Sequence, residues 1–242
     1  MRERVAIVTG GGRGIGRATV LRLAADGLSV VVNYRSDAEA AGQVAKLIVE
    51  SGGAAVTHQA DIADVAGIRT LFDVAENTFG GVDVVVHNAY AMYNKPIAEA
   101  TDDEYERSFA ANTKATLVML REASTRLRTD GRFIYISTLV TRAGKPTTGL
   151  YSASKAAGEQ LVRTFAREIA SRRITANSVL PGQTETDAWR DSPVEIRRLA
   201  ELIPLGRVGR PDDIANMVGF LASDQAGWIT GQSFIVDGGT SL

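Results

Sequence analysis

The sequence predicts a single-domain α/β fold, with helices on both faces of a doubly wound parallel sheet of about seven strands. Short β-branched runs alternate with longer helical patterns along the 242 residues, which is typical of such a sheet. The runs are apolar throughout instead of alternating, as expected for strands that are buried on both faces. No repeat or low-complexity linker divides the chain, so we predict one domain over residues 1–242.

Each element can be placed from its residue pattern. Strands are predicted at Val5–Thr9, Ser29–Tyr34, Ala54–Ala60, Val82–Asn88, Arg132–Ser137, Thr175–Leu180 and Ser233–Val236. Helices are predicted at about Ile15–Asp26, Ala38–Ser51, Val65–Phe79, Asp103–Leu127, Ser152–Ser171 and Asp212–Ala222. Capping residues support several of these helix boundaries, because Asp64 and Asp102 precede helices and Gly27 and Gly52 follow helix ends.

A late segment, at about residues 183–209, has no clear strand and contains Pro193 and Pro204. An excursion of this length in a compact domain is more often functional than a plain connection. We therefore predict that this segment forms a lid over a substrate.

Composition restricts the class of protein. Hydrophobic residues make up 45% of the chain and charged residues 23%, which is ordinary for a soluble globular protein. The net charge of -1 gives no electrostatic reason to expect nucleic acid or an anionic membrane as a partner. The absence of cysteine excludes disulfides and thiolate metal sites, and two histidines, His58 and His87, give no reason to predict a metal. No apolar run approaches the ~20 residues that span a bilayer. The short stretch before the first predicted strand leaves no room for a signal peptide, so we expect none. We expect a cytoplasmic protein that acts on a small molecule.

The first predicted strand leads into a glycine-rich turn at residues 9–16, and a helix follows directly. Glycines allow close backbone approach to a ligand, and a helix start offers free N–H groups to a phosphate. This strand–turn–helix setting is what a Rossmann-type dinucleotide site requires, whereas a glycine-rich turn alone is weak evidence. The candidate cofactor contacts in the turn are Gly10, Arg13, Gly14, Ile15 and Gly16.

The second strand ends in Tyr34 and Arg35, where folds that prefer NAD usually carry an acidic residue. With Arg13, Arg35 provides two guanidinium groups that suit a 2′-phosphate in charge and geometry. The alternative is that both arginines are solvated loop residues. We predict that NADP(H) is the preferred cofactor, with NAD(H) as the alternative.

Tyr151 and Lys155 stand four residues apart, and Thr138 lies thirteen residues before the tyrosine. Positions i and i+4 share one face of a helix, so a phenol and an ammonium can meet there. A neighbouring cation would lower the pKa of the phenol from about 10 and fit it for proton transfer. The same spacing is common on ordinary amphipathic helices, so the pair alone is more often structural than catalytic. It indicates catalysis only together with the other motifs of the chain.

With these motifs the chain resembles the short-chain dehydrogenase/reductase family over nearly its whole length. It is similar to members of the 3-oxoacyl-(acyl carrier protein) reductase type. The resemblance implies catalytic roles for Asn112, Thr138, Tyr151 and Lys155. It implies cofactor contacts at the glycine loop, Tyr34, Arg35, Asp61, Ile62, Asn88, Ala89, Tyr151, Lys155, Pro181, Gly182, Thr184 and Thr186. Members of the family are commonly tetramers, so we expect a homotetramer or a homodimer, with apolar positions such as Leu117, Leu120 and Phe165 available for contacts.

Three positions depart from the family pattern. Thr138 stands where serine is usual; it keeps the hydroxyl but adds a methyl group. The Asn-Asn-Ala-Gly signature reads His87-Asn88-Ala89-Tyr90, so a bulky ring replaces a glycine; this ring either walls off part of the pocket or turns outward. His87 is expected to pack as a strand residue with its hydrogen-bonding groups satisfied. Thr184 replaces an apolar residue, which we expect to matter little.

The resemblance implies hydride transfer between a nicotinamide and a carbonyl or secondary alcohol. In reduction, Tyr151 would act as the acid, Thr138 would orient the carbonyl, Lys155 would tune Tyr151 and bind the ribose, and Asn112 would anchor a relay water. Substrate contacts are expected from Tyr90, Met92, Tyr93, Gln183 and Trp189, with Arg142 and Lys145 as cations near the rim or as plain surface charges. The competing prediction is a catalytically weak NADP(H)-binding sensor or scaffold, which Thr138 and Tyr90 keep open.

Overall fold

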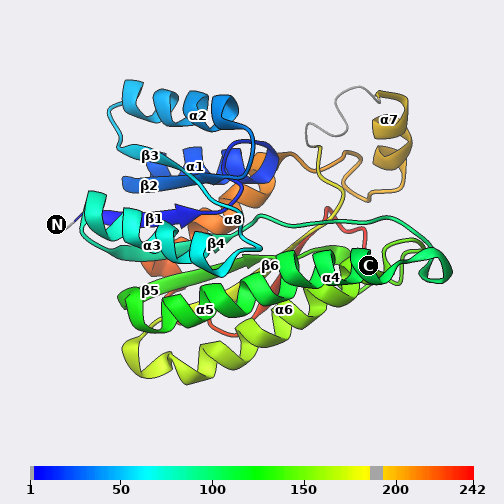
Figure 1. The fold of residues 1–242 in the computed structure, drawn as a ribbon. Helices are drawn as coiled ribbons and strands as arrows, with labels where there is room; N and C mark the ends of the chain where they lie inside the picture. The colour runs from blue at the N-terminus through cyan, green and yellow to red at the C-terminus, as the bar shows by residue number, and fades with distance from the viewer. Residues whose placement is uncertain (1–2, 186–192) are drawn as a thin grey trace.

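The computed structural model describes residues 3–185 and 193–242, and it contains a seven-stranded parallel sheet in the order β3-β2-β1-β4-β5-β6-β7 (Figure 1). The strands are β1 (Arg4–Val8), β2 (Leu28–Tyr34), β3 (Ala55–Gln59), β4 (Val82–His87), β5 (Leu127–Ile136), β6 (Thr175–Pro181) and β7 (Ser233–Val236). The predicted fold class is confirmed. β5 begins earlier than expected, because Leu127 pairs with Val82 before a register shift between Val82 and Val84.

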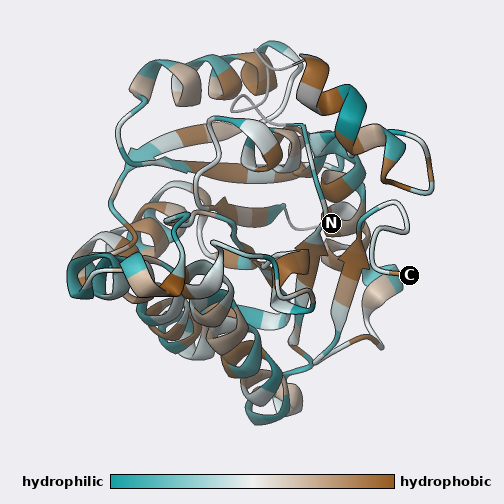
Figure 2. Ribbon diagram, turned by 90° about the vertical axis from the view of Figure 1, so that its right-hand side faces the viewer, coloured by the Kyte–Doolittle hydropathy of each residue, from teal (hydrophilic) through white to brown (hydrophobic). Residues whose placement is uncertain are grey.

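The α-helices of the described residues cover both faces of this sheet. They are α1 (Gly14–Ala25), α2 (Ala38–Glu50), α3 (Val65–Phe79), α4 (Asp102–Phe109), α5 (Ala115–Arg126), α6 (Gly149–Glu168), α7 (Pro193–Glu201) and α8 (Pro211–Ala222). One core layer joins the sheet to α1, α2 and α8, and the other joins it to α3, α5 and α6. The apolar colour of the central strands in Figure 2 matches their burial on both faces, as the unbroken apolar runs predict.

The prediction of one helix over Asp103–Leu127 is wrong in its middle. A π-helical turn at Ala110–Lys114 separates α4 from α5 and contains the buried Asn112. Such turns insert one extra residue into a helix and are frequent at functional sites. The segment at 183–209 also contains a helix that the sequence analysis missed, α7, which stands apart from the sheet in Figure 1.

The loop before α6 holds a strained residue. Thr147 has a φ of 70°, a left-handed conformation that a β-branched side chain rarely adopts. Its carbonyl oxygen accepts a hydrogen bond of 2.8 Å from the backbone N–H of Lys95, which ties the loop after β4 to the start of α6. The strain is thus held by a contact between two loops that border the site.

Thr147→Asn is expected to raise the free energy of unfolding by about 1 kcal/mol, because asparagine tolerates this conformation better. Urea denaturation measures the change. Thr147→Gly also relieves the strain but frees the unfolded chain, so its gain should be smaller. A loss of stability in the asparagine variant would contradict the assignment of strain.

Candidate active site

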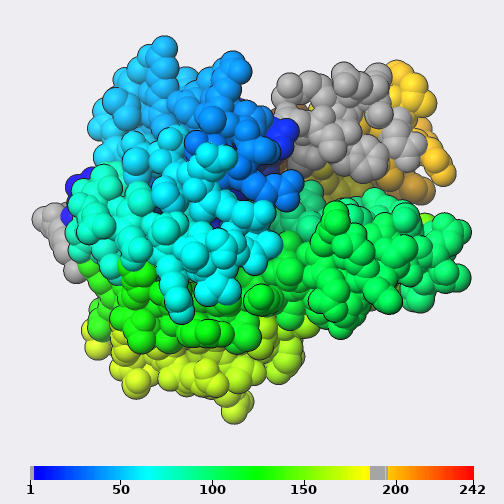
Figure 3. Space-filling model, in the orientation of Figure 1, coloured from blue at the N-terminus to red at the C-terminus, as the bar shows by residue number. Residues whose placement is uncertain are grey.

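A cleft of about 1350 Å³ opens at the carboxyl ends of the central strands (Figure 3). It includes the point between β1 and β4 where the strand order reverses, which is where open α/β sheets bind ligands. Typical small-ligand pockets measure about 300–1000 Å³, so this cleft has room for a dinucleotide and a substrate together. Of the predicted site residues, it is lined by Gly10, Arg13, Gly14, Ile15, Gly16, Tyr34, Arg35, Asp61, Ile62, Asn88, Ala89, Tyr90, Met92, Tyr93, Thr138, Tyr151, Lys155, Pro181, Gly182, Gln183 and Thr184.

The glycine loop has the shape of a phosphate cradle. Gly10 has a φ of 65°, and a Cβ at Gly16 would lie 2.0 Å from the carbonyl oxygen of Gly10. Only glycine therefore allows α1 to start this close to β1. Arg13, the N-cap residue, makes no side-chain bond to the helix start, so the first-turn N–H groups can receive an anion. These features fit the pyrophosphate of a dinucleotide.

Two arginines line the far end of the cleft. Arg13 is exposed and 3.8 Å from Asp37, and Arg35 follows the end of β2. The Asp61 carboxylate accepts the backbone N–H of Ala63 at 2.9 Å, which shapes the turn where a base edge would lie. The guanidinium groups and the open cleft between them fit an additional phosphate.

A buried threonine joins the glycine loop to the end of β4. The Thr9 hydroxyl oxygen accepts the backbone N–H groups of Asn88 and Ala89 at 2.9 and 3.0 Å. In return, the Asn88 amide donates to the carbonyl oxygen of Thr9 at 2.9 Å. This reciprocal set holds the signature loop against the phosphate cradle.

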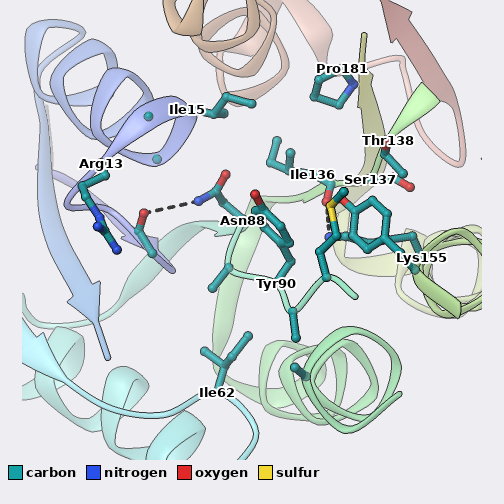
Figure 4. Close-up of a pocket in the computed structure, with 18 of the residues that line it drawn as sticks. Arg13, Ile15, Ile62, Asn88, Tyr90, Ile136, Ser137, Thr138, Lys155 and Pro181 are labelled. Atoms are coloured by element: carbon teal, nitrogen blue, oxygen red, sulfur yellow. Dashed lines mark hydrogen bonds between the residues drawn. The ribbon is translucent and has the colours of Figure 1, made fainter. Parts of the chain in front are cut away.

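Tyr151 and Lys155 both lie on α6 and face the cleft, as the spacing predicts. Burial, and next the nearby Tyr90, raises the pKa of Tyr151, and a hydrogen bond with Thr138 opposes that shift. Burial lowers the pKa of Lys155 to about 7, against an opposing contribution from Glu159. Lys155 is not among the groups that shift the pKa of Tyr151 in this structure, and its ammonium donates a hydrogen bond of 2.7 Å to the Ile136 carbonyl oxygen (Figure 4).

Thr138 and its neighbour Ser137 have separate tasks. The Ser137 hydroxyl donates to the buried Glu159 carboxylate at 2.6 Å, and Arg142 donates to the other oxygen of that carboxylate at 2.5 Å. Thr138 is left to interact with Tyr151. Arg142 is therefore bound to Glu159 and does not line the cleft, unlike Lys145, so half of the expected cationic rim is absent.

Asn112 is buried behind the cleft instead of lining it. Its side chain accepts the backbone N–H of Ala91 at 2.9 Å and donates to the carbonyl oxygen of Ala91 at 2.7 Å. It also donates to the Ser154 hydroxyl of α6 at 2.9 Å. The Thr116 hydroxyl donates to the backbone carbonyl oxygen of Asn112 at 2.6 Å. The π-helical turn thus places one amide where it joins the signature loop to α6.

The two changed signature positions behave differently. His87 is fully buried, and burial together with Lys155 lowers its pKa to about 3, so it is a neutral strand residue. Its Nδ1 lies 3.3 Å from the Thr9 hydroxyl, but its Nε2 is buried without a hydrogen-bond partner in the described structure, so the expectation of a fully satisfied ring is wrong. The His87 ring stacks on Tyr135 with centroids 5.6 Å apart. Tyr90 does not turn outward; Figure 4 shows its ring inside the cleft, between Asn88 and the group formed by Ile136 and Lys155.

The predictions for Thr186 and Trp189 fall outside the described residues. Pro181 ends β6 and Gly182 follows it, and the backbone N–H of Gly182 donates to the carbonyl oxygen of Val236. The sequence analysis missed Tyr135, Ser154 and Glu159. Ser154 and Glu159 follow Tyr151 by three and eight residues on the same predicted helix, so their spacing from Tyr151 was a usable signal, whereas nothing local indicated Tyr135.

Within residues 3–185 and 193–242, no helix combines the length and apolar character that crossing a membrane requires. In the same ranges, no group of three or more acidic, histidine or cysteine side chains is arranged to hold a metal.

A phosphate cradle, an arginine-lined end and a Tyr–Lys pair on one cleft define a dinucleotide-binding oxidoreductase. A family model described as enoyl-(acyl carrier protein) reductase matches residues 10–241. A hydroxynaphthalene reductase-like protein of Metarhizium majus is 39% identical, covering 98% of this chain and 94% of its own. The chain belongs to the short-chain dehydrogenase/reductase family, as its motifs predict.

Solved structures agree with this assignment. A blue fluorescent protein from a metagenomic library, in complex with NADPH, has a TM-score of 0.93 and 38% identity, covering 100% of this chain and 99% of that one. The angucycline C-6 ketoreductase LanV with bound NADP has a TM-score of 0.92 and 37% identity, covering 98% and 95%.

Proposed function

We propose that this protein is an NADP(H)-dependent ketoreductase whose substrate is a ketone attached to a fused aromatic ring system. The enzyme class and the cofactor agree with the family, with the NADPH and NADP of the two similar structures, and with the ketoreductase among them. The observation that carries the reaction is the protonated Tyr151 phenol beside Thr138 and Lys155 in one cleft.

The residue roles follow from protonation and position. The cofactor supplies a hydride to the carbonyl carbon. Gly10, Gly14 and Gly16 would hold its pyrophosphate, and Arg13 and Arg35 its 2′-phosphate. Because the pKa of Tyr151 is raised, its phenol is protonated at neutral pH and can donate to the oxygen that develops negative charge. The Thr138 hydroxyl would orient that oxygen, and Asn112 would hold the loop that faces it.

The substrate class rests on the cleft wall and on two relatives. Tyr90, Met92 and Tyr93 line one side of the cleft, and Leu139 and Val140 line another. Flat apolar rings pack well on aromatic faces. The relatives are named for hydroxynaphthalene and for an angucycline.

A paired assay tests the substrate class. Tetralone, a ketone fused to a benzene ring, and an acyclic 3-oxoester of similar size are each supplied with NADPH, and the loss of its absorbance is followed. We expect kcat/KM to be at least ~10-fold higher for tetralone, since even one methylene group in a hydrophobic pocket contributes about 1–3 kcal/mol. Preference for the 3-oxoester would refute the substrate class. No turnover of any ketone despite tight NADPH binding would favour the sensor or scaffold.

Arg13→Ala and Arg35→Ala are each expected to weaken NADPH binding about tenfold, because a charge-assisted hydrogen bond contributes about 1.5–3 kcal/mol. Binding of NADH, which lacks the 2′-phosphate, should change little. Titration of the intrinsic fluorescence with each cofactor measures both constants. Arg17→Ala, an exposed residue of α1 that does not line the cleft, is the control. An equal loss for both cofactors would contradict the assignment.

We also propose that the protein is cytoplasmic, that residues 183–209 cover the substrate, and that the chain forms a homotetramer or a homodimer. For the last point, Leu117 on α5 is 44% exposed, which supports a contact. Leu120 and Phe165 do not support it, because they are buried in the core of the single chain. Light scattering of the purified protein measures the mass of the assembly.

A further inference from the structure

The Lys155 ammonium lies between two tyrosine rings. Its Nζ is 4.7 Å from the centroid of Tyr135 on β5 and 5.7 Å from the centroid of Tyr90, in the loop after β4. Both distances fall within the ~6 Å at which a cation is attracted to an aromatic face. One ring is part of the core, and the other reaches into the cleft.

The surroundings offer this cation little other support. Lys155 is 1% exposed, and its hydrogen bond to Ile136 occupies one of three N–H donors. The titratable groups around it are His87 on β4, Tyr90 after β4, Tyr135 on β5, and Tyr151 and Glu159 on α6. Of these, His87 is neutral, and the Glu159 carboxylate is already bonded to Ser137 and Arg142. The two aromatic faces therefore provide much of the electrostatic stabilisation that the Lys155 ammonium loses when it is removed from water.

Tyr90 contacts both members of the catalytic pair. Its ring centroid is 5.7 Å from that of Tyr151, with the planes tilted by 52°. The next residue, Ala91, is held through both backbone groups by Asn112. The ring is thus carried by an anchored stretch of backbone, at the position where the family signature has glycine.

We propose that Tyr90 is an additional positioning residue of the Tyr151–Lys155 pair, and that it completes with Tyr135 an aromatic cage around the Lys155 ammonium. The inference rests on the proposed function for the roles of Tyr151 and Lys155. The cage itself is a property of the folded chain, so it can be tested without turnover.

Tyr90 is the residue to change, because it is 57% exposed, whereas Tyr135 is fully buried and its loss would disturb the core. Tyr90→Leu removes the aromatic face, and Tyr90→Phe keeps it. Urea denaturation from about pH 5 to pH 9 locates the pH at which the folded protein releases the Lys155 proton and stability begins to rise. Protonation of His87 in the unfolded chain also makes the free energy of unfolding depend on pH, but by the same amount in Tyr90→Leu and Tyr90→Phe.

We expect Tyr90→Leu to move this transition down by about half to one pH unit, and Tyr90→Phe to leave it in place. Tyr93→Leu, on the same loop but without a ring contact to Lys155 in the described structure, should also leave it in place. In a Lys155→Met background, the leucine and phenylalanine variants should show no such difference. Equal transitions for Tyr90→Leu and Tyr90→Phe, or a difference that persists without Lys155, would overturn the cage.

Kinetics separate this proposal from the proposed function. With tetralone and NADPH, the alkaline limb of kcat/KM should move down with the stability transition in Tyr90→Leu and stay in place in Tyr90→Phe. A shifted stability transition in a protein that reduces no ketone would support the cage and refute the ketoreductase. A ketoreductase whose transition does not move would refute the cage alone.

Discussion

Replacing Tyr151 with phenylalanine is expected to lower kcat for ketone reduction by about 10²–10⁴-fold, the range that a positioned proton donor contributes. The structure places the protonated Tyr151 phenol beside Thr138 on the cleft wall. Phenylalanine keeps the ring that packs against Tyr90 and removes only the hydroxyl. Steady-state kinetics with saturating NADPH measure the loss.

The binding of NADPH should stay within about twofold of the parent, because the phosphate cradle lies between β1 and α1 and Arg35 directly follows β2, all away from Tyr151 on α6. Tyr90→Phe, which deletes the neighbouring hydroxyl instead, is a matched control and should keep most of the turnover. Turnover that is unchanged in Tyr151→Phe would refute the role of Tyr151 as the proton donor.

Lys155→Met is expected to abolish most turnover and yet to stabilise the protein at low pH. The pKa of Lys155 falls from 10.5 in the unfolded chain to about 7 in the folded one because of burial. Between these two values the unfolded state binds more protons, so the free energy of unfolding rises with pH through this window. Below pH 7 the cost of the buried charge is present in full, and methionine removes it.

The gain at pH 6 should be on the order of 3 kcal/mol. The pKa shift corresponds to roughly 5 kcal/mol, and the carbonyl oxygen of Ile136, left without its donor, takes back about 1–2 kcal/mol. The difference between parent and variant should shrink toward pH 9, where the parent carries a neutral amine. Lys145→Met, an exposed lysine at the rim of the cleft, serves as the control and should show no pH-dependent difference. A gain that is the same at pH 6 and pH 9 would contradict the buried charge.

The comparison of sequence and structure is clearest at Asn112. Its presence as a candidate catalytic residue was predictable from its motif, but the π-helical turn that holds it was not. Local pattern favours one continuous helix over this stretch. The turn is stabilised by bonds to Ala91 and Ser154, which are 21 and 42 residues away along the chain, and no helical periodicity reports such contacts.

Thr138 and Arg142 also separate what the sequence predicts from what only the tertiary structure shows. Neighbouring side chains of a strand point to opposite faces, which predicts that Ser137 cannot take the place of Thr138. The Ser137 hydroxyl is indeed bonded to Glu159. Nothing local indicated that Arg142 would bind that same carboxylate instead of facing a substrate. Charged side chains in loops are long and adaptable, so their partners depend on which elements pack nearby.

The sequence by itself determined the parallel sheet, the phosphate cradle, and the Tyr151 and Lys155 pair on one helical face. These features depend on short-range patterns: unbroken apolar runs for the strands, helical periodicity, glycines at set positions, and two side chains four positions apart on a helix. The tertiary structure decided how that pair is tuned. Burial keeps Tyr151 protonated and brings the pKa of Lys155 to about 7, and packing places the rings of Tyr135 and Tyr90 close to the Lys155 ammonium. Desolvation and ring contacts arise only when distant segments pack together, so no local pattern of residues could state them.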